Sequence, residues 1–528
     1  IVLAGLVAAS VAADQLIENY NASLTSYLYV GSTTGKTLVQ GVRPRFEQRE
    51  VNIDGTADAP PEDLNLASSA GLGRSFGMGP GRGLGDDWFA DGPLDAAGGV
   101  PGTRMGSIDL SLGNYSSFEI DLRLPAPGFS WTIGRCFNGR QLDSSDASFD
   151  SNGYQGLNWS QLSQPEIVFH DDSGGAQNDM IYLVSSAGSF VEFVRFSEES
   201  STFKGRNGAV GAFVFTAGSD GQPDLWTYTG QHGGKMVFFG FDVNAGAAKG
   251  QLWKLIDPGD NPACAGSPGG GGAASRGGYA GGGRMTAAYD PANRRYSYTY
   301  SGSAIGGAIR LTQVLCERLT SGTWATSPVT ATVATVDYTY YQSGGTTFGD
   351  EGNLKQVTGT VPSSVASVDL VRKRYYRYWT GTFNASTNPG HPNLIQYIVD
   401  AEGVRAFDWS DSTWDDDHFT ASESSLKPYA SSYFTYDSSR RIQTTWSSGA
   451  CGCSGGSGNG THVFTYGTNG SHPATSGYDT AWKSVTNVKF PSETANAAEN
   501  KYLSQYFDEV GQAVSRALTD GNPLGGGS

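Results

Sequence analysis

The sequence predicts a mainly β protein, organised as one long antiparallel sheet of hairpin repeats. Glycine supplies 74 of the 528 residues, and only 16% of the residues are charged. This composition is typical of short strands joined by tight turns. In residues 107–140, short runs alternate between apolar and polar side chains and end at Gly-Asn or Pro-Gly pairs, which indicates hairpins.

Tyrosines at alternate positions of successive runs are the strongest repeat signal. They are Tyr296, Tyr298 and Tyr300, then Tyr338 and Tyr340, then Tyr376 and Tyr378, followed by Tyr397, Tyr436 and Tyr466. Alternate residues of a strand lie on one face, and one or two hairpins cannot bury such a face alone. We therefore expect stacked hairpins with a tyrosine-lined face. Packing into the core is the expected fate of these rings, and stacking on sugars at an exposed face is the alternative.

Three segments resemble YD repeats, the hairpin unit of Rhs (rearrangement-hotspot) and teneurin-like shells. They are "YIVDAEGVRAF", "FTYDSSRRIQTTW" and "YFDEVGQAVSRALTDG", in which an aromatic–Asp pair or its equivalent precedes a turn and a second strand. The resemblance spans residues 106–521 and is clearest at 434–445 and 505–521. It implies a spiralling sheet wound into a cocoon or tube, which in that family encloses a toxin or presents a binding surface and is not itself an enzyme. The chain differs from toxin carriers in lacking a "DPxGxxDG" cleavage motif.

These patterns divide the chain into six segments. We predict an apolar docking segment (1–36), a Gly/Pro/Asp-rich irregular region (37–105), a hairpin region resembling the start of an Rhs shell (106–264), a Gly-rich loop or linker (265–284), a YD-repeat region (285–521) and a tail (522–528).

The N-terminal stretch "IVLAGLVAASVAADQ" has no charge before Asp14. A signal peptide is one interpretation, because small residues precede Asp14. A bilayer span needs about 20 apolar residues, so no membrane span is expected. The other interpretation is a short buried helix or strand, preceding the strand-like "SLTSYLYVG", that docks into its own subunit or a neighbour. Its apolar side chains would form the assembly contact: Ile1, Val2, Leu3, Leu6, Val7 and Val11.

Three further sets of side chains are candidate sites. Calcium is the candidate cofactor, because carboxylates cluster in two loops; a solvated acidic loop is the alternative. The calcium candidates are Asp143, Asp146, Asp150, Asp408, Asp411 and Asp415. The glycosylation sequons begin at Asn21, Asn114, Asn158, Asn384, Asn459 and Asn469. Cys451 and Cys453 are disulfide candidates. No motif identifies catalytic residues.

Composition also limits the function. The net charge of −16 argues against nucleic acid as a partner, since phosphate binding needs a basic face. The first hypothesis is a secreted or cell-surface, non-enzymatic structural protein that assembles head-to-tail with copies of itself into a fibre or array. The second is an Rhs-like cocoon that encloses a payload or its own N-terminal plug. The third is a protein that binds or acts on carbohydrate, with glycans as partners.

Overall fold

The computed structural model describes most of the chain from Arg104 onward. The described residues are 104–105, 107–124, 131–139, 154–161, 165–170, 179–186, 189–195, 201–205, 211–219, 222–230, 233–242, 249–256, 262–265, 279–280, 284–324, 326–344, 347–366, 370–411, 417–447, 461–470, 482–490, 501–508 and 513–520. They form a mainly β fold whose paired strands are all antiparallel, which confirms the predicted fold class. Among them, no helix is both long and apolar enough to cross a bilayer.

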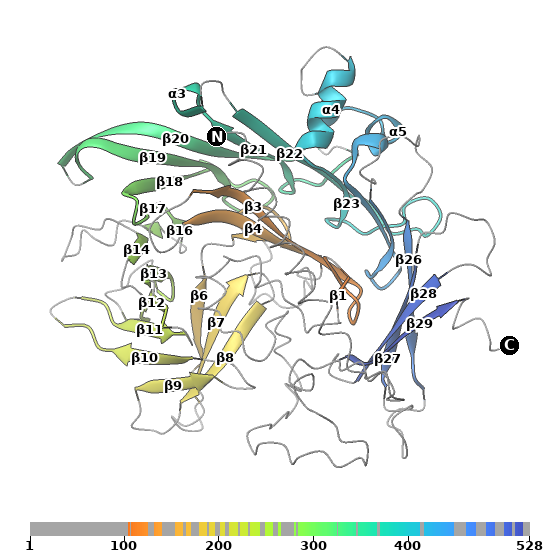
Figure 1. Ribbon diagram of the computed structural model, residues 1–528, viewed down its shortest axis with the longest axis horizontal. Coiled ribbons are helices and arrows are strands. Elements are labelled where there is room, and N and C mark those ends of the chain that lie inside the picture. The colour runs from red at the N-terminus through yellow and green to blue at the C-terminus, as the bar shows by residue number, and fades with distance from the viewer. Residues whose placement is uncertain are drawn as a thin grey trace, which may run out of the picture.

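An inner sheet of five strands comes first. Its strands are β1 (Arg104–Met105), β2 (Ile108–Asp109), β3 (Asn114–Arg123), β4 (Thr132–Asn138) and β5 (Trp159–Gln161). Neighbours in the sequence pair as neighbours in the sheet. In Figure 1 these strands lie in the middle of the molecule, beneath β20–β22, with the rest of the fold around them.

The following eight strands close on themselves. They are β6 (Glu166–His170), β7 (Met180–Ser186), β8 (Ser189–Arg195), β9 (Thr202–Gly205), β10 (Ala212–Thr216), β11 (Leu225–Thr229), β12 (Lys235–Phe239) and β13 (Leu252–Ile256). A bridge between Glu166 and Gln251, and a hydrogen bond from Ile167 N to Gly250 O (2.8 Å), join β6 to the start of β13. An eight-stranded barrel is narrow enough for side chains to fill it, and Phe193, Phe213 and Phe238 do so.

From β13 the same sheet continues as a long curved wall. Its strands are β14 (Pro262–Ala265), β17 (Ala287–Tyr289), β18 (Arg294–Tyr300), β19 (Leu311–Thr323), β20 (Thr326–Tyr340), β21 (Leu354–Val361), β22 (Leu370–Tyr378), β23 (Ile395–Val399), β24 (Ser432–Tyr436), β25 (Ile442–Ser447), β26 (His462–Thr468), β27 (Ser484–Lys489), β28 (Lys501–Phe507) and β29 (Ala513–Asp520). Each pairs with the next in chain order. The short pair β15 (Tyr279–Ala280) and β16 (Arg284–Met285) stands apart. Figure 1 shows the wall curving around the inner sheet.

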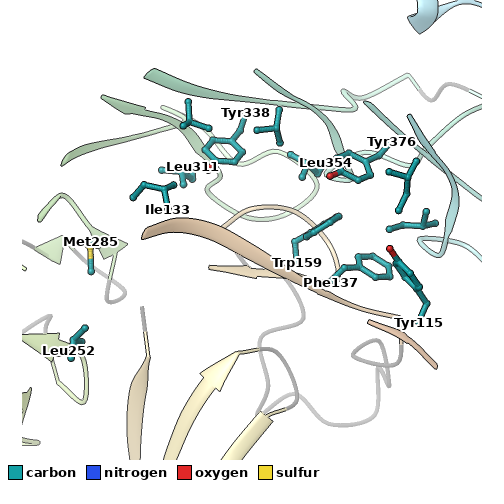
Figure 2. Close-up of a cluster of buried hydrophobic side chains, with 14 of the residues drawn as sticks. Tyr115, Ile133, Phe137, Trp159, Leu252, Met285, Leu311, Tyr338, Leu354 and Tyr376 are labelled. Carbon is teal, nitrogen blue, oxygen red and sulfur yellow. The ribbon is translucent and has the colours of Figure 1, made fainter. Parts of the chain in front are cut away.

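One hydrophobic core joins the barrel, the inner sheet and the concave side of the wall. Figure 2 shows part of it, with Tyr115, Phe137 and Trp159 of the inner sheet facing Tyr338 and Tyr376 of the wall. The tyrosines predicted to share a face are buried here, so the expectation of core packing is confirmed for Tyr296, Tyr298, Tyr338, Tyr340, Tyr376, Tyr378 and Tyr436. Tyr397 is also buried, but it pairs with Arg377 and belongs to a second core on the other side of the sheet. The prediction that it shares the face of the other tyrosines is therefore wrong.

A helical insertion replaces one predicted hairpin turn. The segment "YIVDAEGVRAF" ends strand β23 and then forms α4 (Ala401–Asp411), so its interpretation as a YD hairpin is wrong. The insertion continues with η5 (Asp417–Phe419), α5 (Glu423–Leu426) and η6 (Lys427–Tyr429) before β24 begins. A shorter helix, α3 (Ser363–Ala366), lies between β21 and β22. The six predicted segment boundaries remain predictions.

Candidate functional site: the concave wall and the strap that crosses it

Residues 108–124, here called the strap, cross the concave face of the wall strand by strand. They comprise β2, β3 and the turn between them. Contacts of the strap with six of the wall strands follow in reverse chain order. The contacts are Leu110 O with Thr486 Oγ1 of β27, Gly113 O with Ile442 N of β25 (2.7 Å), the ring of Tyr115 with that of Phe434 of β24 (4.4 Å between centroids), Glu119 with Arg374 of β22, Asp121 Oδ2 with Tyr338 Oη of β20 (2.9 Å), and Leu124 O with Arg294 of β18 (3.3 Å).

A buried ion pair lies at the centre of this crossing. Arg135 of β4 and Asp121 of β3 form it, with side chains 0% and 4% exposed. The wall surrounds the pair with hydroxyl groups, because Tyr338 donates to Asp121 and Tyr376 accepts from Arg135. The guanidinium also lies over the ring of Trp159, 5.0 Å from its centroid. Burial opposes the charge on Arg135, but the attraction of Asp121 outweighs it and raises the pKa of Arg135 further above its ordinary value.

Further tyrosine hydroxyls of the wall hold the rest of the inner sheet. Trp131 donates its indole N–H to Tyr298, and Trp159 donates to Tyr378, both at 2.9 Å. Tyr340 donates to the carbonyl oxygen of Tyr154 (3.2 Å) as well as to one on its own sheet. A buried hydroxyl needs a partner. Tyrosine therefore suits a sheet face that must bury its rings against a second sheet with polar groups of its own.

Two turns of the wall are built around an aspartate in the same way. In the turn after β24, Asp437 Oδ1 accepts from Ser439 N and Arg441 N, both at 2.9 Å, and Oδ2 pairs with the Arg441 guanidinium. The positive φ of Arg440 (62°) closes this turn.

The turn after β17 has the same geometry, which the sequence reasoning missed. Asp290 Oδ1 accepts from Ala292 N and Arg294 N, Oδ2 pairs with Arg294, and Asn293 has a φ of 58°. The signal was an aromatic–Asp pair followed by arginine four residues after the aspartate, shared by "YDPANR" and "YDSSRR".

The helical insertion buries a second polar cluster on the other face of the wall. His418 is fully buried between Asp408 of α4 (Nδ1 to Oδ1, 3.1 Å) and Gln356 of β21 (Nε2 to Oε1, 2.8 Å). Arg377 of β22, also fully buried, donates to the carbonyl oxygens of His418 and Ala421. These bonds fix the insertion to the sheet, and solvent does not reach the imidazole.

The structure describes only Asp408 among the side chains of the six calcium candidates. Asp408 is 7% exposed, and its carboxylate accepts from His418. The side chains of Asp143, Asp146, Asp150, Asp411 and Asp415 lie outside the described residues. Within the described part of the chain, no group of three or more His, Cys, Asp or Glu side chains has the arrangement of a metal site. The calcium hypothesis stays a prediction.

The four described sequon asparagines differ in exposure. Asn114 and Asn158 are 2% and 0% exposed, and their amide nitrogens donate to Asn138 Oδ1 and Asn393 O. A glycan on either nitrogen would have to displace these contacts. Asn469 is partly buried and donates to Trp482 O. Asn384 is exposed, which makes it the best placed of the four.

The remaining predicted residues fall outside the described part. These are the assembly residues Ile1, Val2, Leu3, Leu6, Val7 and Val11, the sequon residues Asn21 and Asn459, and the cysteines Cys451 and Cys453. The described thiols of Cys136 and Cys316 are buried.

Comparison with known proteins gives fold similarities of low score. No known family model matches the sequence, and no curated protein does either. The N-terminal domain of the effector protein SpvB from Salmonella typhimurium strain LT2 is 12% identical over 49% of this chain and 94% of that domain, with a TM-score of 0.21. A structure of TcdB2-TccC3-Cdc42 is 9% identical over 78% of this chain and 19% of that chain, with a TM-score of 0.25. These values do not assign the chain to a family.

Proposed function

We propose that the chain is a secreted, non-enzymatic β-shell protein whose concave wall encloses polypeptide, beginning with the inner sheet of its own chain. One observation carries the proposal: the strap meets six strands of the wall in order and is held there by buried hydroxyl, charged and backbone groups. The wall is thus shaped to hold an extended peptide along its concave face. This corresponds to the cocoon hypothesis, in which the enclosed content belongs to the same chain.

The nature of the contacts supports enclosure rather than sheet extension. No strand of β1–β5 pairs with a strand of the wall, because the inner sheet forms its own ladders. The contacts between them are side-chain hydrogen bonds, ring contacts and isolated backbone bonds. The inner sheet and the wall are thus two separately hydrogen-bonded sheets in face-to-face contact, with the inner sheet as the enclosed part.

Two alternatives find less support in the described residues. Stacking on sugar requires an exposed ring face, yet none of the aromatic side chains described is in the exposed class. For hydrolysis, the His418–Asp408 pair supplies no reachable acid or base, because both side chains are buried. No contact among the described residues favours the fibre hypothesis.

Negative-stain microscopy combined with hydrogen exchange tests the proposal. We expect isolated closed particles, together with amides in β3 and β4 that exchange as slowly as those of the wall strands β20 and β22. Filaments, or fast exchange of β3 and β4 in a protein whose wall is protected, would contradict it. Arg405→Ala is a suitable control variant, because its ion pair with Glu402 on α4 is exposed and far from the strap in the sequence. We expect it to leave the exchange rates of β3 and β4 unchanged.

A further inference from the structure

Among the described residues, β29 pairs with β28 alone, and two of its side chains on the side that faces the core are exposed. Leu518 pairs with Leu503 of β28, and Arg516 pairs with Gln505. Directly paired residues point to the same side of a sheet, and Leu503 belongs to the main core. Yet Leu518 is 68% exposed and Arg516 is exposed. We call Leu518 and Arg516 the β29 strip; it is apolar and basic, on a chain of net charge −16.

The chain before Arg104 begins close to this strip. Arg104 pairs with Asp109, and Leu110 O accepts from Thr486 of β27. β29 lies two strand spacings beyond β27, which is about 10 Å. Figure 1 shows β1 in the space that β27–β29 face.

One segment before Arg104 matches the strip in chemistry. Residues 86–91, "DDWFAD", place Trp88 and Phe89 between three aspartates. Residues 89–104 extend to at most about 50 Å, so the segment easily reaches β29. Two large rings beside carboxylates complement a leucine beside an arginine, since ring burial drives the contact and the ion pair orients it.

We propose that residues 86–91 dock on the β29 strip and thereby extend the enclosed content beyond the strap. This inference rests on the proposed function, because it names further polypeptide held by the same wall. The strip is then an intramolecular peptide-binding surface, and its ligand is an acidic, aromatic segment of the same chain.

Cysteine labelling of the full chain tests this docking. Leu518→Cys is introduced together with Cys264→Ser, Cys451→Ser and Cys453→Ser, and its rate of reaction with a negatively charged maleimide is measured. Ser515→Cys is the matched control, because Ser515 pairs with Tyr506 and points to the opposite side of β29. We expect position 518 to react about tenfold more slowly than position 515, as local protection requires. The double change Trp88→Ser and Phe89→Ser should remove that difference.

A charge exchange adds a second arm that leaves the rings intact. Arg516→Glu should speed labelling at position 518, and the further changes Asp86→Arg and Asp87→Arg should slow it again. Equal rates at positions 515 and 518 in the chain with residues 86–91 intact would overturn the proposal. Slow labelling at position 518 that persists after Trp88→Ser and Phe89→Ser would also overturn it. If that slow rate then depended on protein concentration, a second copy of the chain would be the occupant. None of these outcomes alters the exchange rates of β3 and β4, so the proposed function is tested separately.

Discussion

Replacing Asp121 by alanine should destabilise the protein far more than removing any exposed carboxylate. The change leaves the Arg135 guanidinium charged and 0% exposed, between the rings of Trp159 and Tyr376. Breaking a buried ion pair from one side costs about 3–5 kcal/mol, a large share of the 5–15 kcal/mol that is typical of whole proteins. Glu119→Ala is the matched control on the same strand, because its partner Arg374 is 33% exposed and such pairs contribute about 0–1 kcal/mol.

The assay is urea unfolding followed by tryptophan fluorescence, with hydrogen exchange to locate the loss. We expect Asp121→Ala to lower the urea midpoint strongly and to speed exchange in β3 and β4 before it does so in the barrel strands. The double variant Asp121→Ala with Arg135→Met should recover most of the loss, since an apolar pair in a buried site is often neutral or stabilising. A single variant that loses less than about 1 kcal/mol, or a double variant that is worse than the single one, would refute the assignment of a buried charged pair.

Three further perturbations address the tyrosine face and the turns. Burial raises the pKa of Tyr296 and Tyr340, so above about pH 10 the unfolded chain loses protons that the folded one keeps. Stability should fall by about 1.4 kcal/mol per pH unit for each such tyrosine. A step in tyrosinate absorbance should therefore accompany unfolding at high pH, and unfolding without such a step would contradict this. Gly113→Ala should lower the free energy of unfolding by about 1–3 kcal/mol, measured from the thermal midpoint. Gly113 has a φ of +65°, and a Cβ there would lie 2.6 Å from that of Arg441. An unchanged midpoint would mean that the strap is not held at this turn. Asp437→Ala should lower the free energy of unfolding by about 1–3 kcal/mol, whereas Asp437→Asn keeps the two backbone hydrogen bonds and should lower it less. Equal losses for the two variants in urea unfolding would show that the ion pair alone matters.

Which tyrosines of one strand share a face could be predicted from the sequence, because strand geometry alone decides it. The face that a single tyrosine such as Tyr397 takes could not be predicted, since it depends on the register of its strand with the neighbouring strand. Successive residues of a strand alternate between faces, so Tyr298 and Tyr300, or Tyr376 and Tyr378, had to share one. That these tyrosines are buried could also be predicted, because their rings have a large apolar area. The hydroxyl partners could not be predicted, since Trp131 lies 167 residues from Tyr298 and Trp159 lies 219 residues from Tyr378.

The helix at residues 401–411 shows where local chemistry is ambiguous. Asp400 Oδ1 accepts from Gly403 N (2.8 Å), three residues on, and Asp437 Oδ1 accepts from the N–H groups of residues two and four positions on. An aspartate that caps a helix and one that closes a turn therefore satisfy similar nearby N–H groups. After Asp437, the ion pair with Arg441 and the positive φ of Arg440 favour the turn. After Asp400, packing of Val404 and Phe407 into a second core favours the helix, and that packing is not visible in the sequence.

The buried pair Asp121–Arg135 was missed for a related reason. In the sequence, "EIDLRL" and "IGRCF" have the alternation of half-exposed strands, in which charged residues face solvent. Here the wall covers the face on which the charges lie, and Tyr338 and Tyr376 supply the hydrogen bonds that make their burial tolerable. Only the docking of two distant sheets creates such a site.

The two halves of the long sheet solve the same packing problem in different ways. In the closed part, the inward residues include the phenylalanines Phe193, Phe203 and Phe213, which contact one another or nearby rings. Where the sheet opens, its radius exceeds what side chains can fill, and the inward residues include Tyr298 and Tyr338, whose hydroxyls meet a second sheet. The hydroxyls of these two tyrosines thus serve the contact between two sheets, which a phenylalanine could not make. On this reasoning, Tyr338→Phe should weaken the binding of the strap to the wall, because it removes the hydroxyl that donates to Asp121.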